Sequence, residues 1–141
     1  MEVQDVKRWL MRGWKINGEI DGLITQKKEE WDRVTSITAN LDQESVDGTK
    51  DPHKLDRYAS FDSLITAKMD ELYSVKAEIK EAIDKVEDRR YREVLRARYE
   101  RNMTWEEIAV EMHYYYRYVR KLDRKALEAL GSILEVIPMQ N

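Results

Sequence analysis

The residues best suited to chemistry form a basic group near the C-terminal end of the chain. They recur at the spacing of one helix face and comprise Tyr116, Arg117, Arg120, Lys121, Arg124 and Lys125. In the major groove, arginine and lysine can donate hydrogen bonds to guanine O6 and N7, and neighbouring cations can neutralise phosphates. Tyrosine can donate to phosphate or pack on a thymine methyl group. The pattern therefore predicts a surface that binds double-stranded DNA.

The distribution of charge favours the same chemistry, although the net charge of the chain is −3. Residues 89–130 carry 11 lysines and arginines against 7 aspartates and glutamates, whereas residues 1–88 carry 14 against 20. A basic segment on an acidic body is typical of a protein that touches phosphate with one end. A chance excess of cations on a solvated helix surface would give the same numbers. Charge alone leaves both interpretations open.

The sequence around this basic group has the signals of a helix-turn-helix. A first helix is interrupted at Asn102, and Thr104 and Glu107 have the spacing of a capping box. We expect a short helix after this box, a turn at His113, and a last helix over 115–130. The residues expected to form the core and turn of the motif are Thr104, Trp105, Ile108, Ala109, His113, Val119 and Leu122.

Residues 104–130 resemble region 4 of bacterial sigma-70 factors, the helix-turn-helix that reads the −35 promoter element. The resemblance rests on the segments WEEIA at 105–109 and YVRKLDRKAL at 118–127. With its long helical N-terminal part, the chain resembles sigma-70 region 4-like phage proteins. These include the ArpU/RinA-type phage transcriptional regulators and a related phage family of unknown function. The resemblance implies base contacts from the exposed residues Tyr116, Arg117, Arg120 and Lys121.

Two positions depart from the family pattern. His113 stands where the turn usually has glycine, and histidine tolerates positive φ better than most residues. Tyr115 stands where serine or threonine usually caps the recognition helix, and because tyrosine cannot cap in the same way, we expect the start of that helix to be looser or shifted. The helical spacing also places Tyr115 first in the buried stripe of this helix. Gly131 is expected to cap the C-terminal end of the same helix.

The elements that position this motif are predicted to be helical throughout. Only 5 glycines and 2 prolines interrupt the chain, and apolar residues recur at helical spacing. We expect a short helix over 3–14, a weak point at Asn17-Gly18 and a long helix from residue 19 to 41. A polar loop at 42–56 then leads to a second long helix over 58–86 with a nearly heptad stripe. The expected fold class is therefore all-α, with a long, coiled-coil-like N-terminal hairpin before the helix-turn-helix.

This pattern predicts three parts with different roles. Residues 1–87 would form the helical hairpin and oligomerisation region, residues 88–131 the DNA-binding domain, and residues 132–141 an apolar tail that packs back on the body. The hairpin stripe is too long for its partner to cover, which favours a homodimer.

Several classes of function are disfavoured by composition. The chain has no cysteine, and its two histidines, His53 and His113, lack metal-ligand spacing. There is no glycine-rich phosphate loop and no apolar run long enough for a membrane. We therefore expect no enzyme activity, no cofactor and no metal site in a cytoplasmic protein.

The leading hypothesis is a sequence-specific transcriptional regulator of phage type. One alternative is the DNA-recognition subunit of a packaging machine, like a small terminase subunit. Another is a sigma-like module that binds RNA polymerase or a different protein without touching DNA.

Overall fold

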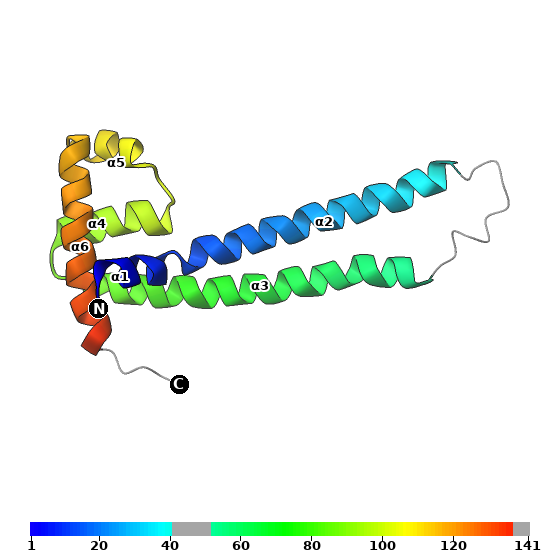
Figure 1. Ribbon diagram of the computed structural model, residues 1–141, viewed down its shortest axis with the longest axis horizontal. Helices are drawn as coiled ribbons and strands as arrows, with labels where there is room; N and C mark the ends of the chain where they lie inside the picture. The colour runs from blue at the N-terminus through cyan, green and yellow to red at the C-terminus, as the bar shows by residue number, and fades with distance from the viewer. Residues whose placement is uncertain (41–51, 137–141) are drawn as a thin grey trace. The chain divides into compact units, whose positions relative to one another are not determined.

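A computed structural model describes the backbone of residues 1–40 and 52–136, and the side chains of residues 1–35 and 56–136. The elements are shown in Figure 1. They are α1 (Val3–Leu10), α2 (Arg12–Asn40), α3 (Pro52–Asp84), α4 (Arg89–Leu95), the π-helical turn η2 (Arg96–Glu100), α5 (Trp105–Met112) and α6 (Tyr116–Val136). No strand occurs in these two stretches. The predicted all-α fold is confirmed, with a long N-terminal helix packed on a second helix before the C-terminal helix-turn-helix.

The chain forms two compact units. One comprises Trp14–Tyr73, and the other combines Met1–Gly13 with Ser74–Asn141. The sequence predicts a division of the chain at residue 87 by function, into an oligomerisation region and a DNA-binding domain. That functional division stays a prediction.

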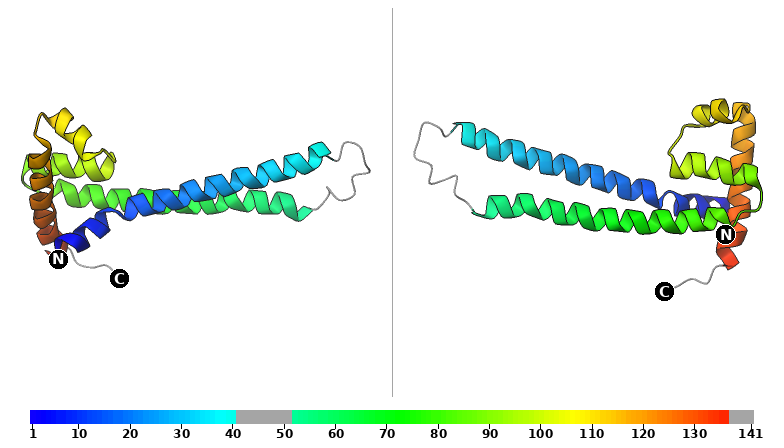
Figure 2. Two further views of the ribbon diagram at one scale, coloured as in Figure 1. Left: turned by 45° about the horizontal axis from the view of Figure 1, so that its top comes forward. Right: turned by 180° about the vertical axis from the view of Figure 1, so that it is seen from behind.

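In the unit Trp14–Tyr73, α2 and α3 run side by side in both views of Figure 2. The polar residue Lys27 interrupts the apolar stripe of α2, but it forms an ion pair with Asp62 of α3. Its ammonium group also lies 5.2 Å from the ring centroid of Tyr58. The hydrogen bond that Lys27 donates to the Asp62 carboxylate raises the pKa of Lys27. A charge at an inward position is thus matched by a partner on the facing helix.

The expected weak point at Asn17-Gly18 is wrong, because α2 continues through it from Arg12. The interruption falls at Met11, between α1 and α2. A glycine inside a helix costs only about 1 kcal/mol relative to alanine. Ile16 and Ile20 are both buried and flank the pair, so packing outweighs this propensity.

The loop expected over 42–56 ends earlier than predicted, because α3 already begins at Pro52, and proline is a favourable first helical residue. Its remainder, 42–51, lies outside the described residues.

In the other unit, α6 packs against α1, α4 and α5. Its buried stripe comprises Val119, Leu122, Asp123, Ala126, Leu127, Leu130 and Gly131. The expected cap at Gly131 is wrong, because α6 runs on to Val136. A Cβ at residue 131 would lie 3.0 Å from Val6 Cγ2 and 3.1 Å from the Met1 carbonyl oxygen. Gly131 therefore permits the close approach of α1, and residues 132–136 belong to α6.

The structure contains no described helix that is both long enough and apolar enough to cross a membrane.

Candidate nucleic-acid interface

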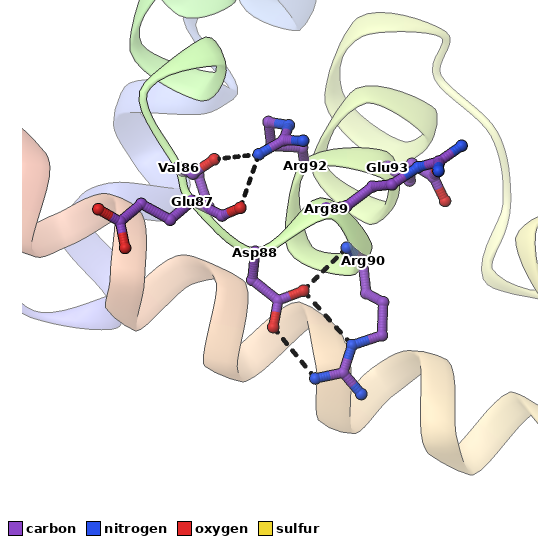
Figure 3. A network of polar contacts seen from close by, with 7 residues as sticks. All are labelled: Val86, Glu87, Asp88, Arg89, Arg90, Arg92 and Glu93. Atoms are coloured by element: carbon purple, nitrogen blue, oxygen red, sulfur yellow. Dashed lines mark hydrogen bonds and ion pairs between the residues drawn. The ribbon is translucent and has the colours of Figure 1, made fainter.

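The connection from α3 to α4 is fixed by two arginines, as Figure 3 shows. The Asp88 side chain caps α4 by accepting a hydrogen bond from the Arg90 backbone nitrogen at 2.9 Å, and it also pairs with Arg90 Nη2 at 3.0 Å. These bonds lower the pKa of Asp88, with the side chain of Arg90 as the main cause. Arg92 Nη1 donates to the carbonyl oxygens of Val86 at 2.6 Å and Glu87 at 2.8 Å. The entry into the motif is thus held by charged hydrogen bonds.

Arg90 also supports the recognition helix α6 directly. Its Nη1 donates to the Tyr118 hydroxyl at 2.9 Å. The Tyr118 ring in turn meets the Tyr114 ring edge-on, with 4.9 Å between the centroids. Tyr118 is therefore occupied in joining α4, the turn and α6.

The start of α5 has the expected capping box. Thr104 Oγ1 accepts from the Glu107 backbone nitrogen at 3.1 Å, and the Thr104 backbone nitrogen donates to Glu107 Oε1 at 3.2 Å. The interruption before it lies at Asn102, whose φ is 57°. His113 ends α5 in the left-handed conformation, with φ 58° and ψ 41°. The turn therefore forms where the sequence indicates, with histidine in place of glycine.

The helix-turn-helix encloses a small core. Ile108, Ala109 and Val119 are buried there together with Ala97 of η2. Trp105, Met103, Met112 and Tyr114 are partly buried against this cluster. Leu122 is also buried. The expected core residues thus meet around the crossing of α5 and α6, and η2 contributes one more.

The expected burial of Tyr115 is wrong, since its side chain is 87% exposed. Tyr115 precedes α6, and its carbonyl oxygen accepts the first helical hydrogen bond from the Val119 backbone nitrogen at 3.0 Å. A residue before the first helical turn need not follow the 3.6-residue periodicity, so the stripe begins at Val119.

All six residues of the predicted DNA-binding set are exposed on α6. Within the described part of the chain, Arg117, Lys121 and Lys125 make no hydrogen bond or ion pair. Arg124 has only a distant pairing, with 3.8 Å between its Nε and Glu128 Oε1. The cationic charge of this face is therefore largely uncompensated and can meet phosphate.

Arg120 differs from these cations because its guanidinium group has two contacts. Its Nη1 donates to the Tyr116 hydroxyl at 3.2 Å, and its Cζ lies 4.7 Å from the ring centroid of Trp105. Arg98 of η2 also lies over this ring, with its Cζ 4.4 Å from the centroid. Sequence reasoning missed this Arg98–Trp105–Arg120 cluster, because helical periodicity alone does not place Arg98 near Trp105.

The comparison with protein families matches this part of the chain. Residues 78–131 match the family model of sigma-70, region 4. The chain carries a sigma-70 region 4 domain. Comparisons of the chain with curated proteins and with solved structures returned no match. A region 4 domain is a helix-turn-helix that binds DNA and is typically not an enzyme.

The region 4 domain also contains a buried carboxyl group that sequence reasoning did not single out. Asp123 lies on the inner side of α6 and is only 6% exposed. The Tyr99 hydroxyl donates to its Oδ1 at 3.2 Å. Burial raises the pKa of Asp123 to about 6, and the Tyr99 hydrogen bond and the charges of Lys7, Arg120 and Arg98 oppose this shift. Burial also raises the pKa of Tyr99.

Among the described residues, no three histidine, aspartate or glutamate side chains gather where they could hold a metal ion. His113 lies in the turn of the region 4 domain, and the side chain of His53 lies outside the described residues.

Proposed function

We propose that the chain binds double-stranded DNA in a sequence-specific manner through α6 and regulates transcription, as a phage or prophage protein in the cytoplasm. The observation that carries this proposal is the exposed face with Arg117, Lys121 and Lys125, which form no hydrogen bond or ion pair with the described residues and belong to a region 4 domain. The phage assignment rests on the resemblance to the ArpU/RinA-type regulators.

The physical basis is the recognition mode of a helix-turn-helix. The N-terminal half of the recognition helix enters the major groove, where it can reach base edges. Flanking cations release counterions from the DNA when they neutralise phosphates. A cation that is already paired with a carboxylate would have to break that ion pair first. Arg117, Lys121 and Lys125 form no ion pair with the described residues and have no such cost, which supports a phosphate-binding role.

A homodimer formed through the unit Trp14–Tyr73 completes the proposal. Apolar side chains of α2 and α3 are about half exposed in this unit: Ile24 at 49%, Trp31 at 49%, Leu64 at 52% and Met69 at 41%. Exposed apolar side chains are typical of interaction surfaces where they form one continuous patch. A second copy would cover them and would present two recognition helices to two half-sites.

Light scattering after size exclusion tests the dimer. We expect a mass twice the 16.9 kDa of one chain. A monomer mass at micromolar protein excludes the dimer. A larger ring would instead favour the packaging subunit.

Selection from a random duplex pool tests the DNA-binding function. We expect the unaltered chain to enrich one motif. A variant with Lys121→Glu and Lys125→Glu should recover none, because like charges repel phosphate. Lys76→Glu with Lys80→Glu is the matched control, since both lysines are exposed on α3 with the same spacing. If the unaltered chain enriches nothing in low salt, the region 4 domain serves a protein partner such as RNA polymerase instead.

A further inference from the structure

The cations of α6 differ in how firmly their side chains are held before DNA arrives. Arg117, Lys121 and Lys125 make no polar contact with the described residues. The guanidinium group of Arg120 is held by the Tyr116 hydroxyl at 3.2 Å and by the Trp105 ring, 4.7 Å away. Fixing a long cationic side chain on binding costs rotamer entropy, and Arg120 has already lost part of this freedom.

The support under Arg120 is itself fixed to the domain. Trp105 lies within the capping box, directly after Thr104, as the first residue of α5, and its ring packs against the core cluster of the helix-turn-helix. Arg98 lies over the same ring and its Nη1 donates to the Met103 carbonyl oxygen at 2.9 Å. Arg98 therefore ties Trp105 to the loop before α5. The ring is a platform whose position is set by η2, the loop and the core.

These contacts matter because arginine and lysine recognise DNA differently. The planar guanidinium group can donate two parallel hydrogen bonds to guanine O6 and N7, which requires a defined orientation. A flexible lysine acts as a point charge and tolerates many phosphate geometries. An oriented arginine among cations that make no polar contact with the described residues is thus suited to sequence readout.

We propose that Arg120 is the specificity-determining residue of α6, and that Tyr116, Trp105 and Arg98 are positioning residues that orient it. This inference rests on the proposed DNA-binding function. It goes further because it assigns sequence readout and general affinity for DNA to different residues of α6. Lys121 and Lys125 supply affinity for any duplex. Tyr116 acts through Arg120, in place of the direct base contact that the family resemblance implies.

A double-mutant cycle with Arg120→Lys and Tyr116→Phe tests the inference. The measured quantity is the ratio of dissociation constants for a scrambled duplex and for the selected duplex, at fixed salt. Arg120→Lys keeps the charge but loses the planar fork, so we expect the ratio to fall roughly 5- to 150-fold, the range for one bidentate base contact. Affinity for the scrambled duplex and its salt dependence should stay unchanged. Arg124→Lys is the matched control and should leave the ratio within about twofold.

Tyr116→Phe removes only the hydroxyl group that holds Arg120. We expect the ratio to fall by a smaller factor in the unaltered chain and not to fall further when Arg120→Lys is already present. An equal effect in both backgrounds would mean that Tyr116 contacts DNA itself and would overturn its positioning role.

The remaining outcomes separate the two proposals. If the unaltered chain prefers the selected duplex and Arg120→Lys keeps that preference, Arg120 does not read bases and the inference is overturned. If the unaltered chain binds both duplexes equally or not at all, the proposed function itself fails. Thermal melting of each variant by circular dichroism checks that a change in ratio is not a loss of fold.

Discussion

Replacing the buried Asp123 by asparagine should stabilise the protein near neutral pH. The carboxyl group is 6% exposed, and burial raises its pKa from 3.8 to about 6. At about 1.4 kcal/mol per pKa unit, this shift corresponds to roughly 3 kcal/mol as an order of magnitude. The folded state binds the proton more tightly than the unfolded state. The stabilising contribution of this proton is therefore complete below pH 3.8 and is lost as the pH rises through about 6.

The variant Asp123→Asn cannot ionise, yet its Oδ1 can still accept the hydrogen bond from Tyr99. Its amide nitrogen adds an offset that does not depend on pH, so the comparison between two pH values isolates the carboxylate. We expect the free energy of unfolding of the variant, relative to the unaltered chain, to rise by about 2 kcal/mol between pH 4 and pH 7. Urea denaturation followed by circular dichroism measures this difference. A difference that is independent of pH would refute the reasoning, because it would mean that Lys7, Arg98 and Arg120 fully compensate the burial of the charge.

Four further substitutions test the local structure, each by urea denaturation. Thr104→Ala removes one half of the capping box and should cost about 1 kcal/mol, and an unchanged stability would show that the box is not formed in solution. His113→Gly should stabilise by up to about 1 kcal/mol, because φ is 58° there, and a loss of stability would argue against the left-handed turn. Gly22→Ala should stabilise α2 by up to about 1 kcal/mol, since nothing lies within 4 Å of the added Cβ. Gly131→Ala should stabilise less or destabilise, because the Val6 side chain lies 3.0 Å away, and equal effects would exclude the close approach of α1.

The elements of the helix-turn-helix could be predicted from the sequence because their signals are local. The capping box depends on two residues three positions apart, and the helices depend on apolar residues at a regular spacing. The left-handed turn at His113 also follows from its place between two such helices. These features involve only near neighbours in the chain.

The cluster around Trp105 could not be predicted, because it depends on distant packing. The π-helical turn η2 changes the residue spacing just where Arg98 lies, so a periodicity of 3.6 residues does not apply there. The hydrogen bond that Asp123 accepts likewise comes from Tyr99, 24 residues away along the chain. The sequence around Gly131 resembles the C-terminal cap of a helix. Its actual role, the close approach of α1, could not be foreseen because α1 lies more than 120 residues earlier in the chain.

The dependence of duplex affinity on salt tests the central claim most directly. The comparison uses the unaltered chain, the variant Lys121→Ala with Lys125→Ala, and the control Lys76→Ala with Lys80→Ala, whose lysines are exposed on α3 at the same spacing. Each phosphate contact contributes about 0.9 to the slope of log affinity against log salt concentration. We predict that the first variant loses about 2 from this slope while the control keeps the full slope. An unchanged slope in the first variant, or an equal loss in both, would contradict the account that α6 meets the phosphates of DNA.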